Sequence, residues 1–231
     1  MCVLLLAAAQ FCGGCGASVE PIYVASGCPS QPLRGPEAYA NEPANQLIDD
    51  FESGDADLPS PSVEGRDGQW VLGSDQSSDS PIHEVSSHCA ARGKWAGHFA
   101  ASGFANWGLN WTAVFRATLK TAVPYDGSAY NAISFFASLS QGSGDALDVP
   151  VGLTTMDNAW NSNGCSPCMD FYAAKVRLSQ NWQRFVIPFD QMKQRGTGAP
   201  QVAMRRDQLV GFIIWPQQAF DIWIDDVRFE R

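Results

Sequence analysis

The sequence predicts an all-β protein, a jelly-roll β-sandwich, and three observations support this fold class. Short apolar or alternating segments recur between turn-forming pairs such as Asp-Gly and Asn-Gly. The 231 residues include 21 Gly and 14 Pro, and few stretches have helical periodicity. With 45% apolar and 17% charged residues, the chain can fill one core of moderate size.

The charge balance excludes nucleic acids as partners. The chain has 15 Lys and Arg against 24 Asp and Glu, which gives a formal net charge of −9, and Arg205-Arg206 is its longest basic run. DNA and RNA binding requires clustered Lys and Arg opposite the phosphates. An acidic chain without such a cluster is not expected to bind them.

Residues 1–15 are expected to form an export signal. An apolar run at residues 3–9 precedes Gly13-Gly14-Cys15, the layout of a processing site, and is too short to span a bilayer. The two glycines before Cys15 resemble a bacterial lipoprotein signal, in which this cysteine is acylated. No Lys or Arg precedes Arg34, so an ordinary cleaved signal is the alternative. We expect an outer-membrane or cell-surface lipoprotein, otherwise a periplasmic or secreted protein, with membrane contact only through the lipid.

Residues 16–46 are expected to form a disordered linker between this signal and the folded domain. Five prolines lie there among Ser, Ala and Gly, without apolar periodicity. Such a segment cannot bury enough surface to fold alone. The alternative is an irregular arm that lies against the domain.

The jelly-roll domain is expected at residues 47–231, as a monomer. Its strands are predicted at residues 69–72, 97–101, 107–119, 132–139, 148–155, 171–178, 182–188, 209–215 and 220–229. A single helical turn is expected after Pro188, and no long helix. The number of short strands favours a sandwich or jelly roll.

The segment 107–119 has one apolar and one polar face. Trp107, Leu109, Trp111 and Phe115 share a face, which we interpret as the core side rather than a sugar-stacking surface. Asn110 lies on the opposite, polar face. Asn110 is therefore the ligand-binding candidate on this strand.

The last strand changes its apolar face once. Phe220, Ile222 and Ile224 alternate with polar residues, whereas the apolar residues that follow Asp225-Asp226 have the opposite parity. A one-residue insertion in a strand is a β-bulge. The sequence therefore predicts a bulge at this acidic pair.

The loop at residues 155–172 has the composition of a sugar-binding loop. An aromatic ring can stack on a pyranose face while carboxylates and amides bind the hydroxyls. The alternative is a long loop that its cysteines staple for stability. The carbohydrate-binding candidates are Asn110, Asp157, Trp160, Asp170, Tyr172 and Trp215.

Four cysteines remain after the signal: Cys28, Cys89, Cys165 and Cys168. In an oxidising compartment they predict two disulfides, for which three connectivities exist. We expect Cys165 and Cys168 to be oxidised, either to each other or to the other two. A zinc site that includes His88 and a redox-active pair are weaker alternatives.

Four segments carry a resemblance to a known superfamily. They are residues 48–52 (IDDFE), 125–135 (YDGSAYNAISF), 182–189 (WQRFVIPF) and 220–227 (FDIWIDDV). Together they resemble the galactose-binding-like β-sandwiches, in particular the family 11 carbohydrate-binding modules and the complex I intermediate-associated proteins. The resemblance implies a jelly roll whose concave sheet binds β-glucan, with a structural calcium near the paired terminal strands.

The expected calcium ligands are Asp50 or Glu52 from the first strand and Asp226 from the last. Acidic residues crowd both strands, and carboxylate oxygens are the ligands that Ca²⁺ prefers. The alternatives are that these acidic residues are solvated strand ends or that an Asp accepts hydrogen bonds from a bulge.

No motif indicates catalysis. The chain lacks a GxSxG elbow, a phosphate-binding loop and an HExxH pair, and its carboxylates do not form a recognisable hydrolase pattern. His83, His88 and His98 are expected to be surface or turn residues. The sequence therefore predicts non-catalytic binding of a polysaccharide or oligosaccharide. A cell-envelope structural or assembly protein and a divergent glycoside hydrolase component are the alternatives.

Overall fold

The computed structural model describes residues 27–30, 42–59, 62–74, 81–102, 113–159, 170–196 and 203–231. These residues form two antiparallel sheets, which confirms the predicted β-sandwich. The strands are β1 (Leu47–Asp49), β2 (Trp70–Ser74), β3 (Ile82–Ser86), β4 (Ala96–Ala101), β5 (Ala113–Thr118), β6 (Ala132–Leu139), β7 (Ala146–Thr155), β8 (Tyr172–Ser179), β9 (Gln183–Pro188), β10 (Leu209–Ile214) and β11 (Phe220–Glu230). The helical turns are η2 (Ala44–Gln46), η3 (Phe189–Gln191) and η4 (Arg206–Gln208). In the described part of the chain, no helix is long and apolar enough to cross a membrane.

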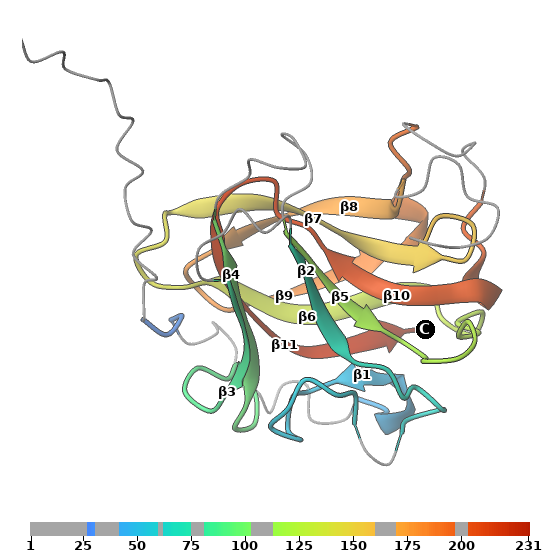
Figure 1. Ribbon diagram of the computed structural model, residues 1–231, viewed down its shortest axis with the longest axis horizontal. Helices are drawn as coiled ribbons and strands as arrows, with labels where there is room; N and C mark the ends of the chain where they lie inside the picture. The colour runs from blue at the N-terminus through green and yellow to red at the C-terminus, as the bar shows by residue number, and fades with distance from the viewer. Residues whose placement is uncertain are drawn as a thin grey trace, which may run out of the picture.

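Strands that are distant in sequence lie side by side in both sheets. The six-stranded sheet has the order β3-β4-β11-β6-β9, with β1 also paired to β11. The five-stranded sheet has the order β2-β5-β10-β7-β8. Figure 1 shows the first strand, β1, beside the last strand, β11. The pairing of the terminal strands is therefore as predicted.

The core lies between the two sheets and follows the alternation of the strands. In β7, Leu147, Val149, Val151 and Leu153 point into the core. Aromatic rings from both sheets meet there; for example, the Phe99 and Phe115 ring centroids are 4.2 Å apart. Burial of these apolar faces is the main stabilising contribution.

The predicted bulge in β11 is confirmed. The register with β6 shifts between Asp225 and Arg228, and Asp226 has a φ of 49°. The shift keeps Ile224 and Val227 in the core although their positions differ by three. It also places the Asp226 and Arg228 side chains close together, with Asp226 Oδ1 2.7 Å from Arg228 Nε.

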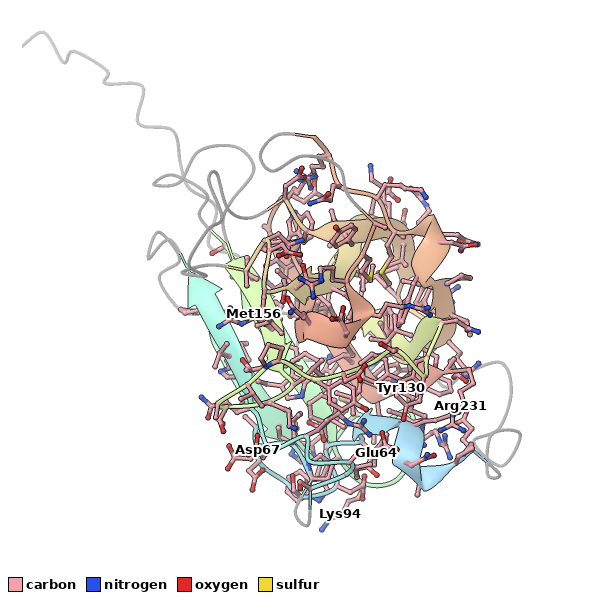
Figure 2. The ribbon with its side chains drawn as sticks, turned by 90° about the vertical axis from the view of Figure 1, so that its right-hand side faces the viewer. Glu64, Asp67, Lys94, Tyr130, Met156 and Arg231 are labelled. Atoms are coloured by element: carbon pink, nitrogen blue, oxygen red, sulfur yellow. A yellow bond between two sulfur atoms is a disulfide. The ribbon has the colours of Figure 1, made fainter. Side chains whose placement is uncertain are left out.

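Three buried side chains gathered around the exposed Glu64 fix the loop before β6. The hydroxyls of Tyr125 and Tyr130 both donate to Glu64 Oε2, at 2.8 and 2.7 Å. Arg66, which is fully buried, donates to Tyr125 and to the Leu47 carbonyl. Figure 2 shows Glu64 and Tyr130 close together near the first strand. The position of residue 131, which follows Tyr130, is set by this cluster.

The described parts of the N-terminal segment are attached to the domain. Cys28 forms a disulfide with Cys89, and Ser30 pairs with Asn181. Glu42 makes ion pairs of 2.9 to 3.1 Å with three arginines on the outer side of the six-stranded sheet, Arg92, Arg184 and Arg228. These parts correspond to an arm that lies against the domain, not to a free linker.

Two features of the six-stranded sheet differ from the sequence-based expectations. Strand β3 was not predicted, because its residues are half-buried or exposed and do not alternate clearly between apolar and polar. His98 was expected at the surface or in a turn, but it lies in β4 and is 6% exposed. Hydrogen bonds to Asp221 and Glu84 satisfy both nitrogens of its ring, which makes its burial acceptable.

Candidate functional site

A cleft opens beside β8, β9 and the segment that precedes β10. Its volume is about 660 Å³, within the range of small-ligand sites. The lining residues are Asn131, Tyr172, Pro188, Phe189, Asp190, Met192, Lys193, Gln194, Ala203, Met204 and Arg206. They come from four separate parts of the chain.

The cleft has an apolar floor and a polar rim. The floor contains Tyr172, Phe189 and Met192, which are 3 to 7% exposed and belong to the core. The rim contains exposed residues, among them Asn131 and Asp190. An apolar floor and convergent polar groups are the arrangement that sugar binding requires.

The segment after β9 builds one wall of the cleft. Pro188 ends the strand and the η3 turn follows, as predicted. The backbones of Lys193 and Ala173 then exchange two hydrogen bonds, of 2.9 and 3.1 Å, so the chain runs alongside β8. Asp170 holds the end of this wall, because its carboxylate accepts from the Arg195 and Gly196 N–H groups at 2.7 and 2.8 Å.

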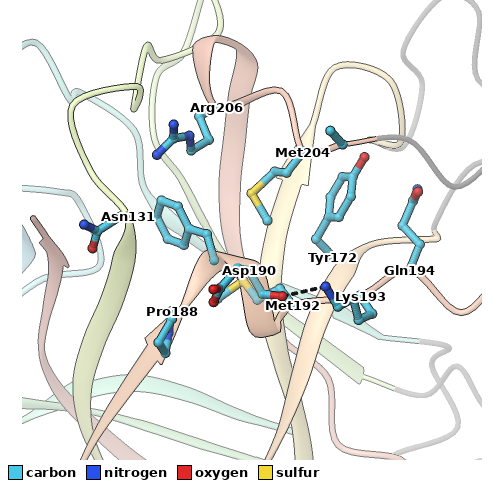
Figure 3. Close-up of a pocket in the computed structure, with 11 residues that line it drawn as sticks. Asn131, Tyr172, Pro188, Asp190, Met192, Lys193, Gln194, Met204 and Arg206 are labelled. Atoms are coloured by element: carbon cyan, nitrogen blue, oxygen red, sulfur yellow. Dashed lines mark hydrogen bonds between the residues drawn. The ribbon is translucent and has the colours of Figure 1, made fainter.

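Some polar groups of the rim have hydrogen-bond partners and others do not. Lys193 Nζ donates to the Asp190 carbonyl at 2.6 Å, and Arg206 Nη1 donates to the Tyr130 carbonyl at 2.7 Å. Within the described parts of the chain, the side-chain amide of Asn131 and the carboxylate of Asp190 have no hydrogen-bond partner. Figure 3 shows Met204 and Tyr172 between Arg206 and Gln194, with Asp190 and Met192 below them. The unengaged amide and carboxylate can therefore bind ligand hydroxyls.

The structure brings together three of the predicted sugar-binding residues. Tyr172 lines the cleft, and burial, together with the nearby carboxylates of Asp157 and Asp170, raises the pKa of its hydroxyl. Asp157 is exposed, whereas Asp170 is 1% exposed and both its carboxylate oxygens are engaged with backbone. Tyr172 is thus a cleft residue, Asp157 lies nearby, and Asp170 holds the wall.

Trp215 lies away from this cleft. It packs against Phe171 and Ile213 in a buried cluster on the outer side of the five-stranded sheet. The Arg195 guanidinium lies over the Trp215 ring, 4.8 Å from its centroid. Because Phe171 and Tyr172 are consecutive in an extended segment, they point to opposite sides of the sheet, which separates Trp215 from the cleft.

Several predicted residues lie outside the described residues. Asn110 and Trp160 as sugar ligands, Cys165 and Cys168 as oxidised cysteines, and Cys15 as the lipidated residue remain predictions. The same holds for the signal at residues 1–15.

Two of the three residues predicted to bind calcium, Asp226 and Glu52, are engaged with other groups, and Asp50 Oδ1 accepts from the Glu52 N–H at 3.2 Å. Asp226 already pairs with two guanidiniums, Arg92 at 2.5 Å and Arg228 at 2.7 Å. Glu52 Oε1 instead accepts from the backbone N–H groups of residues 94 and 95, at 2.7 and 2.9 Å. No three His, Cys, Asp or Glu residues in the described ranges are placed to share a metal ion. Arginines supply the positive charge that the paired acidic strands need.

The fold is similar to solved carbohydrate-binding modules. A family 11 module from Clostridium thermocellum, solved with a β-1,3-1,4-mixed-linked tetrasaccharide, has a TM-score of 0.53 and 14% identity; the match covers 80% of this chain and 94% of that one. The family 11 module of a cellulosomal cellulase from the same organism has a TM-score of 0.51 and 13% identity, over 80% and 93% of the two chains. These likenesses place the fold among carbohydrate-binding-module-like β-sandwiches. No family model matches the chain, and no curated protein matches it.

Sequence reasoning missed most of the cleft. Asn131 directly precedes a predicted strand and Asp190 lies in the predicted turn after Pro188, but neither stands in a ligand-binding motif. Arg206 was noted only as part of a basic pair. The available signal was the turn after Pro188, because loops at strand ends carry many binding residues.

Proposed function

We propose that this chain is a non-catalytic carbohydrate-binding domain that holds a polysaccharide or oligosaccharide in the cleft beside β8 and β9. The observation that carries the proposal is the apolar floor of Tyr172, Phe189 and Met192 beneath an unengaged amide and carboxylate. The likeness in fold to carbohydrate-binding modules supports it. Asp190 carries the one carboxylate among the described lining residues, whereas hydrolysis of a glycosidic bond uses two.

A glycan array with the purified chain tests this proposal. Mixed-linked β-glucan is the first neutral ligand to include, because the similar family 11 module was solved with such a tetrasaccharide. We expect binding to at least one glycan, and weaker binding after Asn131→Ala or Asp190→Asn. Asp145→Asn, a change of an exposed acid in the turn before β7, is the matched control and should bind as the wild type does. The absence of binding to every glycan would overturn the proposal.

We also propose that the protein is exported. The Cys28–Cys89 disulfide supports this, because disulfides persist in oxidising compartments and are rare in the cytosol. Fatty-acid labelling of the wild type, and its loss in Cys15→Ser, would test the predicted lipid anchor.

A further inference from the structure

One segment of this acidic chain that contributes to the cleft is rich in basic residues. The chain has 15 basic residues and a net charge of −9, yet the 14 residues 193–206 hold four basic side chains and no acidic one. Two of the four, Lys193 and Arg206, line the cleft. Positive charge at a concave site raises the local concentration of anionic ligands.

Besides Arg206, each of the other three cations of this segment also contacts a neighbouring residue. Arg195 lies over the Trp215 ring and, with the Gln217 amide oxygen turned toward it, donates to this oxygen at 2.7 and 3.1 Å. Arg205 pairs with Asp207 at 2.9 Å. Lys193 donates to the Asp190 carbonyl.

Arg206 differs, because one edge of its guanidinium has no acceptor among the residues that the structure describes. Nη1 donates to the Tyr130 carbonyl, which orients the group. No acceptor from the described residues lies within hydrogen-bonding distance of Nε or Nη2, and the side chain is exposed. The Nε and Nη2 edge is one that binds a carboxylate with two parallel hydrogen bonds.

We propose that the ligand of the cleft is an acidic polysaccharide, one with uronic acid units, and that Arg206 binds a uronate carboxylate. This inference rests on the proposed function. The pyranose ring lies against the apolar floor, its hydroxyls bind Asn131 and Asp190, and its carboxylate pairs with the free edge of Arg206. The two lining cations outnumber the single lining carboxylate, Asp190, so the cleft favours a negative charge on the ligand.

The test compares one polysaccharide in two charge states. Binding of the full chain to polygalacturonate, to its fully methyl-esterified form and to mixed-linked β-glucan is measured by isothermal titration calorimetry. We expect polygalacturonate to bind at least tenfold more tightly than its ester, and this preference to weaken as the salt concentration rises.

Variants distinguish a specific contribution of Arg206 to binding from the effect of overall positive charge. Arg206→Gln should remove the preference for the acid form. Arg206→Lys, which keeps the charge and loses the planar fork, should restore only part of it. Arg205→Gln is the matched control, since it removes an adjacent, also exposed guanidinium that is paired with Asp207, and it should keep the preference. Thermal melting checks that each variant is folded.

The outcomes distinguish the two proposals. Equal binding of the acid and ester forms, or tighter binding of neutral β-glucan, overturns the uronate inference and leaves carbohydrate binding in place. If Arg205→Gln and Arg206→Gln reduce the preference for the acid form equally, the inference is also overturned, because the effect then comes from overall positive charge. If the chain binds none of the three polysaccharides and no glycan on the array, both the uronate inference and the proposed carbohydrate binding are overturned.

Discussion

The imidazole of His98 lies flat on the indole of Trp223, with ring centroids 4.0 Å apart and planes 1° from parallel. Its two nitrogens lie 3.1 Å from Glu84 Oε1 and 2.8 Å from Asp221 Oδ1. Ser140 links the stack further, because it accepts from Trp223 Nε1 at 2.8 Å and donates to Asp221. A protonated imidazole satisfies both carboxylates and also interacts favourably with the indole face.

This arrangement predicts that the stabilising contribution of His98 falls as the pH rises above 6.5. Burial opposes the charge on His98, but hydrogen bonds to Asp221 and Glu84 outweigh it and raise the pKa above 6.5. A group with a raised pKa in the folded state stabilises fully below its unfolded pKa, and this contribution is lost as the pH rises through the folded value. Urea unfolding between pH 5.5 and 9 measures the effect. His98→Gln should weaken this dependence, to which the raised pKa values of the buried Asp49 and Asp225 also contribute, and His88→Gln should leave it unchanged. A His98 pKa below 6.5 by NMR titration would contradict the prediction.

Gly152 is expected to be essential for the packing of β7 on β8. A Cβ atom there would lie 1.9 Å from the Tyr172 carbonyl oxygen, so Gly152→Ala must displace strand β8. This strand contributes Tyr172 to the cleft. We expect the free energy of unfolding to fall by about 1–3 kcal/mol and ligand binding to weaken. Gly73→Ala is the control, because its nearest atom would be 3.9 Å away. Equal melting temperatures for the two variants would show that the strands are not packed this closely.

The Cys28–Cys89 disulfide leads us to predict how Cys165 and Cys168 are paired. With this pair formed, the remaining connectivity among the four expected cysteines joins Cys165 to Cys168. Peptide mapping without reductant should recover both bonds. Replacing Cys28 and Cys89 by Ser should lower the free energy of unfolding by about 2–4 kcal/mol, because the unfolded chain loses a constraint across 61 residues. A peptide that joins Cys28 to Cys165 would be incompatible with this pairing.

Calcium should not stabilise the domain. Arg92 and Arg228 already neutralise Asp226, and Glu52 is bound to backbone N–H groups. Melting curves in chelator and in millimolar calcium should therefore coincide. A bound ion at a hundredfold excess over its dissociation constant would add about 2.7 kcal/mol. An increase of that size that disappears in Asp226→Asn would contradict this interpretation.

Local patterns in the sequence were sufficient to predict most of the fold. The bulge at Asp225-Asp226 followed from a change of parity within one strand, and strands such as β7 followed from simple alternation. Both patterns involve residues that are neighbours in the sequence, so each can be recognised within a single strand.

Contacts between distant residues could not be predicted in this way. Arg92 lies 134 residues before Asp226, which it neutralises, so the acidic cluster alone resembled a metal site. The burial of His98 depends on Asp221, which lies 123 residues later on the neighbouring strand β11 and contacts its ring nitrogen. The cleft likewise combines Asn131, residues 188–194 and residues 203–206, which only the folded sheets bring together.

Methyl NMR with ¹³C-labelled methionine tests most directly whether the cleft binds carbohydrate. The chain has five Met residues; Met192 and Met204 line the cleft, whereas Met156 is exposed and is not among the lining residues. Titration with the glycan that binds on the array should shift the methyl signals of Met192 and Met204 progressively and leave that of Met156 in place. A glycan that binds without moving Met192 or Met204 would show that carbohydrate is held elsewhere on the domain.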